Sequence, residues 1–260
     1  MPETTSFTAS LKNGTTAPSP TVTPYIPEKP GFGGISLIIF PGGGYGKLAD
    51  HEGHGLAEFF CAEGIACFVV EYRLGVDGFH HPAMIEDAYA AIATVRASAR
   101  EFGIDPRRIG VIGSSAGGHL AAHASVAWDT YESDVSLRPD FTILCYPVVY
   151  MDGDFCHEGT RTNLLGENPS DEQLSATSVV EHVNDKAPPT FIWHTVGDEA
   201  VAVENSIGYA TALRVNGVPF EMHIYQRGGH GLSRKTELAW TTDLFRWLRE
   251  FADGRLMLAK

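Results

Sequence analysis

The chain alternates between short apolar runs and longer stretches with the spacing of amphipathic helices. The run ISLIIF, residues 35–40, is apolar throughout and ends at a Pro-Gly-Gly-Gly turn, which is typical of a strand buried on both faces. The stretch over residues 81–103 has helical spacing, with Pro82 in its first turn and Gly103 at its end. The pattern predicts strands over residues 35–40, 65–72, 108–113, 140–149, 189–195 and 219–226, and helices over residues 52–64, 81–103, 116–127, 204–217 and 235–254.

Strands and helices follow one another over most of the chain, and this order predicts one α/β domain over residues 1–260. We expect a mostly parallel sheet with helices on both faces, so that ligands bind beyond the carboxyl ends of the strands. Residues 1–34, rich in Thr, Pro, Ser and Gly, are expected to form an extended arm with one or two edge strands. Residues 151–187 are expected to form a small insertion, or lid, with one short helix over residues 170–176.

The composition narrows the classes of partner. Of 260 residues, 43% are hydrophobic and 20% are charged, which is enough apolar surface for a sizeable core. The formal net charge of −13 repels phosphate backbones and anionic lipids and argues against nucleic-acid and membrane partners. No apolar run approaches membrane-spanning length, and the first residues lack the basic and apolar regions of a signal peptide, so we expect a cytoplasmic chain, with export of a longer precursor as the alternative.

The four cysteines, none in a C-x-x-C pair, are expected to be structural free thiols, with a disulfide or a nucleophile as the alternatives.

Two serines lie where a predicted strand becomes a helix. Gly113, Ser115 and Gly117 fit the pattern G-x-S-x-G, in which small residues on both sides leave room for a sharp turn. Such a turn lifts the hydroxyl of the central serine clear of the sheet, above a helix N-terminus that favours negative charge. Ser115 is therefore the predicted nucleophile. Ser114 is the competing serine, and its side chain is expected to line the pocket.

A serine hydroxyl needs a base to take its proton, and the base needs an acid to orient it. Asp198 comes just after one predicted strand, and His230 comes just after the last one, in a Gly-rich loop. Both therefore fall at carboxyl ends of strands, on the same rim as Ser115, in the chain order Ser, Asp, His. Glu199 is the weaker alternative to Asp198. A turn or capping role for Asp198 and a solvated loop position for His230 are the non-catalytic alternatives.

The turn PGGGYG, residues 41–46, follows the first buried strand. Its glycines let backbone N–H groups approach a ligand without a Cβ in the way. The amides of Gly43 and Gly44, with that of Ala116 after the nucleophile, are predicted to hold the oxyanion of the reaction. A flexible turn is the alternative. The common phosphate-binding loops are excluded, because the chain lacks both G-x-x-x-x-G-K-[ST] and a G-x-G-x-x-G that opens a helix.

Several histidines raise the question of a metal. His119 and His123 are four residues apart on one predicted helix, but Leu120 stands where the motif H-E-x-x-H has Glu. We expect both to be structural, and we predict neither a metal nor an organic cofactor. Other histidines lie on loops or helix starts near the rim, either as polar loop residues or in contact with substrate: His51, His54, His80 and His81.

Together these motifs resemble the α/β-hydrolase superfamily and, within it, the bacterial acetylesterases, acetyl-xylan esterases and xylanase-associated esterases. The resemblance is carried by TPYIPEKP, PGGGYGKLADHEG, EYRLG, HPAMIEDA, GIDPRRIGVIGSSAGGHLA, PPTFIWHTVGDEAVAVENS and GGHGLS, which span about residues 22–233. It implies that Ser115, Asp198 and His230 form a catalytic triad and that the glycine loop forms the oxyanion hole. Two departures are that Pro41 stands where lipase-like relatives carry His, and Ser114 where relatives often carry Phe or Asp.

The resemblance also implies a substrate class. Lipase-like relatives carry a helical cap before the oxyanion strand, for which residues 1–34 are too few and too rich in proline. With only residues 151–187 as a minimal lid, the site is expected to be open and to suit a short acyl group on a bulky alcohol. Ser114, Tyr45 and His81 are the predicted substrate contacts.

We therefore expect a serine carboxylesterase that removes acetyl groups from xylan-derived or other acetylated sugars, as small molecules or oligosaccharides, through an acyl-enzyme. A feruloyl esterase and a serine peptidase of the prolyl-oligopeptidase type are alternatives with the same triad, although nothing resembling a propeller domain precedes it. A non-catalytic α/β-hydrolase that serves as a binding module is the alternative from a different class. The natural alcohol, the acyl group and the oligomeric state stay open.

Overall fold

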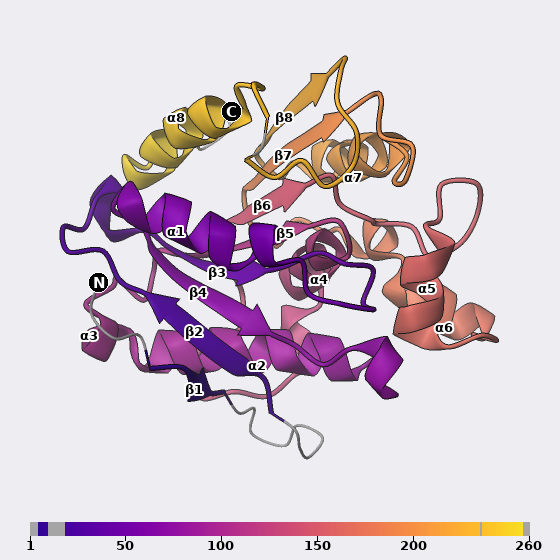
Figure 1. The fold of residues 1–260 in the computed structure, drawn as a ribbon, viewed down its shortest axis with the longest axis horizontal. Coiled ribbons are helices and arrows are strands. Elements are labelled where there is room, and N and C mark those ends of the chain that lie inside the picture. Colours follow the sequence, from indigo (N-terminus) through magenta and orange to yellow (C-terminus); the bar gives the residue numbers. More distant parts are fainter. Residues whose placement is uncertain (1–4, 10–18, 235, 257–260) are drawn as a thin grey trace.

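The computed structural model describes residues 5–9, 19–234 and 236–256, and its centre is an eight-stranded sheet (Figure 1). The strands lie in the order β1-β2-β4-β3-β5-β6-β7-β8; β1 and β2 are antiparallel to their neighbours and the rest are parallel. This confirms the predicted α/β fold with a mostly parallel sheet. The strands are β1 (Phe7–Thr8), β2 (Thr21–Tyr25), β3 (Ser36–Phe40), β4 (Ala66–Glu71), β5 (Ile109–Ser114), β6 (Thr142–Cys145), β7 (Thr190–Thr195) and β8 (Phe220–Tyr225).

Helices cover both faces of the sheet, as Figure 1 shows. One apolar core, which includes Leu37 and Ile39, lies between the sheet and two helices. The other core, which includes Ile38 and Phe40, lies between the sheet and the helices on its opposite face. Because side chains alternate along a strand, successive residues of β3 enter opposite cores, and the strand has no polar face. The first face carries α1 (His54–Ala62) and α8 (Trp240–Ala252), and the second carries α2 (Ala83–Ala97), α3 (Ala99–Phe102), α4 (Ala116–Val126) and α7 (Glu204–Val215).

The predicted N-terminal arm is partly described. Two strands form in it: β1 lies at the edge of the sheet and pairs with β2, which pairs in turn with β4. Residues 1–4 and 10–18 of the arm lie outside the described residues. None of the helices in the described part of the chain combines the length and the apolar character that crossing a bilayer requires.

The insertion, residues 151–187, contains more helix than the sequence predicts. The expected helix is present as α6 (Asp171–Thr177), with a capping box at its start. A second helix, α5 (Glu158–Leu165), has no counterpart in the prediction. It is capped by His157 rather than by the usual Ser, Thr, Asp or Asn, and it buries only one threonine and two leucines. Neither a cap signal nor an apolar stripe therefore marks it in the sequence.

Several predicted boundaries also differ from the structure; the helix expected over residues 235–254, for example, begins at Trp240. The strand expected over residues 140–149 ends at Cys145, because Tyr146 has a φ of 38° and turns the chain out of the sheet. The helix expected over residues 81–103 is divided at Ser98 into α2 and α3.

All four cysteines are free thiols, as predicted. Two of them, Cys67 and Cys145, lie on sheet strands and are fully buried. Burial raises the pKa of Cys145 to about 12, so this thiol stays protonated at neutral pH and is a poor nucleophile.

The strand order creates a place for a ligand. The chain passes from β3 to β4 on one side of β3 and then to β5 on its other side. The connections after β3 and β5 therefore diverge, and such switch points are where open α/β sheets bind ligands. Phe40 pairs with Gly113, which places the glycine turn after β3 beside the serine turn after β5.

Candidate active site

The turn from β5 into α4 holds Ser115 at the carboxyl edge of the sheet. Ser115 has φ 55° and ψ −121°, a conformation that L residues rarely adopt and that marks a sharp, strained turn. A Cβ on Gly113 would lie 1.9 Å from the carbonyl oxygen of Gly117, and a Cβ on Gly117 would lie 2.1 Å from that of Phe40. Glycine is thus required at both positions by the close approach of strand, turn and helix.

Three side chains that are far apart in the sequence form one hydrogen-bonded chain. His230 Nε2 lies 2.8 Å from Ser115 Oγ, and His230 Nδ1 lies 2.7 Å from Asp198 Oδ2. Because a carboxylate only accepts hydrogen bonds, Nδ1 carries the proton and Nε2 accepts from the serine hydroxyl. The ring therefore has the tautomer that a general base for Ser115 needs.

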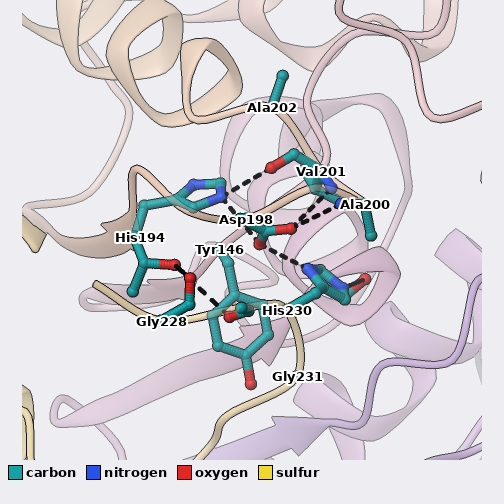
Figure 2. A network of polar contacts seen from close by, with 12 residues as sticks. Tyr146, His194, Asp198, Ala200, Val201, Ala202, Gly228, His230 and Gly231 are labelled. Carbon is teal, nitrogen blue, oxygen red and sulfur yellow. Dashed lines mark hydrogen bonds and ion pairs between the residues drawn. The ribbon is translucent and has the colours of Figure 1, made fainter. Parts of the chain in front are cut away.

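Asp198 receives hydrogen bonds on both oxygens, and Figure 2 shows His194 and His230 on either side of it. Oδ1 accepts from the backbone N–H groups of Ala200 at 3.0 Å and Val201 at 2.9 Å. Oδ2 lies 3.2 Å from His194 Nε2 as well as bonding His230. Burial raises the pKa of Asp198, but the hydrogen bonds from His194 and His230 outweigh it and hold that pKa well below its usual range. The carboxylate is therefore ionised at neutral pH.

His194 is a residue of this network that the sequence analysis missed. It lies on β7, and its side chain is fully buried. Its Nε2 faces Asp198 and the carbonyl oxygen of Val201, both of which can only accept, so Nε2 carries a proton. Its Nδ1 lies 2.7 Å from Ser206 Oγ on α7. The sequence does contain a signal for this residue, because a histidine stands four residues before the predicted acid. It lies inside residues 189–195, which the pattern identifies only as a strand.

The amides of Gly43, Gly44 and Ala116 lie on the two turns beside Ser115. Gly43 has φ 126° and Gly44 has φ 64°, which favour glycine. Ala116 is the first residue of α4, so its N–H has no acceptor within the helix. Among the described residues, no acceptor engages the N–H groups of Gly43 or Gly44. Free donors on both turns give the site the means to bind a negatively charged oxygen.

A buried carboxylate, also missed from the sequence, supports the glycine turn. Glu52 is 2% exposed, and its Oε2 accepts the N–H of Gly42 at 3.0 Å while its Oε1 accepts the hydroxyl of Tyr146 at 2.6 Å. The Tyr146 hydroxyl accepts the N–H of Ser233 at 3.0 Å, and its ring meets that of His230 edge-on, with centroids 5.0 Å apart. Glu52 and Tyr146 therefore connect the glycine turn to the loop that carries His230.

Replacing Gly43 by Ala should disable this turn. A Cβ there would lie 2.3 Å from the carbonyl oxygen of Lys47, and the φ of 126° disfavours any other residue. We expect kcat on p-nitrophenyl acetate to fall about 10²- to 10³-fold, as for the loss of an oxyanion donor. Gly103→Ala is the matched control, because Gly103 has φ 68° with nothing within 4 Å of the added Cβ. An unchanged kcat in Gly43→Ala would contradict a role for this turn in turnover.

Two of the predicted substrate contacts are buried instead. Tyr45 has no exposed surface, and its hydroxyl lies 2.8 Å from His119 Nδ1, so it belongs to the core. Ser114 is 1% exposed and follows Ile112 by two residues on β5, so it faces the side of the sheet that α1 and α8 cover. Its hydroxyl is buried beside the side chains of Cys145 and Tyr146. The prediction that these two side chains line the pocket is wrong for the free protein.

The remaining predicted contact, His81, lies among other histidines. Its ring stacks on that of His123, with centroids 5.4 Å apart, and no described contact joins it to Ser115, Asp198 or His230. His119 donates from Nε2 to the carbonyl oxygen of Thr177 at 2.8 Å and accepts at Nδ1 from Tyr45. Both ring nitrogens of His119 are thus engaged. No cluster of three or more His, Cys, Asp or Glu side chains suited to a metal ion occurs among the residues that the structure describes.

Burial of His119 predicts a loss of stability in acid. Desolvation lowers the pKa of His119 from 6.5 to about 4. Between these values the unfolded chain binds a proton that the folded chain does not, so the free energy of unfolding falls as the pH drops. His119→Gln should reduce the fall between pH 7 and pH 4.5 by about 2 kcal/mol, measured by urea denaturation at each pH. His80→Gln, at an exposed histidine, is the control, and an equal fall in wild type and His119→Gln would contradict this account.

Sequence and structural relatives point to one family. The BD-FAE family model matches residues 25–213. The chain is 37% identical over 205 residues to endo-1,4-beta-xylanase B of Butyrivibrio fibrisolvens, covering 76% of this chain and 32% of the relative. It is 34% identical over 237 residues to the acetylxylan esterase of Xylanibacter ruminicola, covering 86% of this chain and 47% of the relative. The chain thus spans less than half the length of these two proteins.

A solved structure matches over nearly its whole length. It is the crystal structure of an acetyl ester-xyloside bifunctional hydrolase from Caldicellulosiruptor lactoaceticus, with a TM-score of 0.85, 38% identity, and coverage of 96% of this chain and 97% of that one. The family match runs from β2 into α7 and includes the glycine turn, Ser115 and Asp198. The chain belongs to the BD-FAE family of α/β-hydrolases.

Proposed function

We propose that this chain is a serine carboxylesterase that removes acetyl groups from acetylated sugars, including those derived from xylan. The observation that carries the proposal is the hydrogen-bonded chain from Ser115 through His230 to Asp198, beside backbone amides without acceptors. Ser115 is the nucleophile, His230 the general base, and Asp198 the group that fixes the ring and stabilises its protonated form. Gly43, Gly44 and Ala116 are the oxyanion donors.

The reaction has two steps. In the first, Ser115 Oγ attacks the acyl carbon while His230 Nε2 takes the hydroxyl proton, and the carbonyl oxygen becomes an oxyanion. The C–O bond to the alcohol then breaks, and His230 returns the proton to the departing alcohol oxygen. In the second, water attacks the acetyl-enzyme while His230 takes one of its protons; His230 gives that proton to Ser115 Oγ as the acyl C–O bond breaks, and acetic acid leaves and ionises to acetate. No step needs a metal or an organic cofactor.

The small insertion and the named relatives support acetyl esters of sugars. Residues 151–187 form two short α-helices, of which α5 contacts the glycine turn, and so small an insertion favours a short acyl group on a bulky alcohol. The relatives include a protein named acetylxylan esterase and one named acetyl ester-xyloside bifunctional hydrolase. In the assay below, a feruloyl esterase would prefer the feruloylated sugar, whereas a prolyl-oligopeptidase-like peptidase or a non-catalytic module would release no acetate from the sugars.

The test is acetate release from a panel of acetylated and feruloylated xylo-oligosaccharides, with p-nitrophenyl acetate, butyrate and decanoate beside it. We expect acetate release from the acetylated sugars and a fall in rate from acetate to decanoate. Ser115→Ala is the control for each substrate. Faster turnover of decanoate, or of the feruloylated sugar, would overturn the proposal.

A further inference from the structure

A histidine at the start of α5 has one ring nitrogen without a partner. His157 Nδ1 accepts the backbone N–H of Thr160 at 3.1 Å and lies 2.8 Å from the hydroxyl of the same residue. Because a backbone N–H only donates, Nδ1 carries no proton, and the neutral ring carries its proton on Nε2. Within the described part of the chain nothing accepts from this Nε2–H, and the side chain is only half-buried. His157 therefore presents a hydrogen-bond donor at the protein surface.

The helix that follows His157 lies over the glycine turn. Asn163 Nδ2 donates to the carbonyl oxygen of Gly44 at 2.8 Å. A Cβ on Gly44 would lie 3.9 Å from Thr160 Oγ1, the atom that also contacts His157. In Figure 1, α5 lies beyond the carboxyl ends of the parallel strands. His157 therefore lies one helical turn before Thr160, whose side chain lies beside Gly44 in the predicted oxyanion turn.

His157 is also within electrostatic range of the triad. Burial lowers its pKa, the charge of protonated His230 lowers it further, and the carboxylate of Asp198 opposes both effects. Its ring is therefore neutral at neutral pH, in agreement with the proton position that Thr160 imposes. Because Thr160, which contacts His157, lies beside Gly44, His157 lies at the edge of the candidate active site.

We propose that His157 is a specificity-determining residue whose Nε2–H donates a hydrogen bond to an oxygen of the sugar alcohol of the substrate. An acetyl group offers a methyl and one carbonyl oxygen, and the carbonyl oxygen is taken by the oxyanion amides. The sugar ring offers hydroxyl, ring and glycosidic oxygens as acceptors. Because the Nε2–H of the neutral ring carries no net charge, it can donate to these uncharged oxygens without favouring a negatively charged substrate. This inference rests on the proposed function.

The test compares two esters whose alcohols differ in oxygen content. Partly acetylated xylobiose offers acceptors to His157, whereas the alcohol part of phenyl acetate offers none. His157→Asn keeps an oxygen that can cap the N–H of Thr160, but it is too short to replace the Nε2–H donor. We expect kcat/KM on acetylated xylobiose to fall about tenfold, mainly through KM, and kcat/KM on phenyl acetate to stay within about twofold.

Two further variants make the result specific. His157→Gln carries an N–H near the position of Nε2 and should recover part of the loss on xylobiose. His182→Asn changes an exposed histidine elsewhere in the insertion and should match wild type on both esters. Equal losses of His157→Asn on both esters, or no loss on either, would overturn the role of His157 alone. A wild-type enzyme that cleaves phenyl acetate but not acetylated xylobiose would instead overturn the sugar-ester function, and this inference with it.

Discussion

Ser115→Ala is expected to lower kcat on p-nitrophenyl acetate about 10⁶-fold. The substitution removes the only side-chain oxygen that lies within hydrogen-bond distance of His230 Nε2, at 2.8 Å, among the described residues. Without it no acyl-enzyme forms, and the remaining groups can only assist direct attack by water. The measurement is initial-rate hydrolysis under saturating substrate, with enzyme concentration fixed by absorbance.

The neighbouring serine provides a matched control. Ser114→Ala removes a buried hydroxyl for which no contact with His230 or Asp198 is found among the described residues, so turnover should stay within a few-fold of wild type. Loss of activity in Ser114→Ala with activity retained in Ser115→Ala would contradict the assignment of Ser115 as the nucleophile.

Asp198→Asn is expected to lower kcat about 10³- to 10⁴-fold, through the tautomer of His230. The side-chain oxygen of Asn must face the backbone N–H groups of Ala200 and Val201, which only donate. The amide NH₂ then faces His230 and donates to Nδ1, which moves the ring proton to Nε2. A protonated Nε2 cannot accept the proton of Ser115.

The adjacent acid is the control for this substitution. Glu199 is exposed and was the alternative orienting acid, so Glu199→Gln should leave kcat within about twofold of wild type. The two variants are compared by kcat on p-nitrophenyl acetate and by circular dichroism for folding. A large loss in Glu199→Gln, with activity retained in folded Asp198→Asn, would contradict the assignment of the acid.

The sequence predicts which residues reach one edge of the sheet, because carboxyl ends of parallel strands share that edge. Ser115, Asp198 and His230 each follow a strand, and the structure brings the three side chains together. Direction is harder to predict than position. Ser114 and Tyr45 are neighbours of the site in sequence, yet the two-residue period of a strand and the core partner His119 turn them away from it.

The sequence does not predict the supporting residues, because their hydrogen-bond partners are set by the packing of strands and loops. His194 fits the pattern of a buried strand, and the loop after β7 brings Asp198 to its ring. Glu52 looked like a polar residue at a helix start, whereas its carboxylate is buried between Gly42 and Tyr146. A buried polar group must find a partner, but neither propensity nor periodicity identifies which one.

The most direct test of the account is the site of covalent modification by a fluorophosphonate, which reacts with a serine that a histidine activates. Intact-protein and peptide mass spectrometry should find one adduct per chain, on Ser115, and no adduct in Ser115→Ala. A chain that stays unmodified, or that carries the adduct on another residue, would contradict the claim that Ser115 is the activated nucleophile.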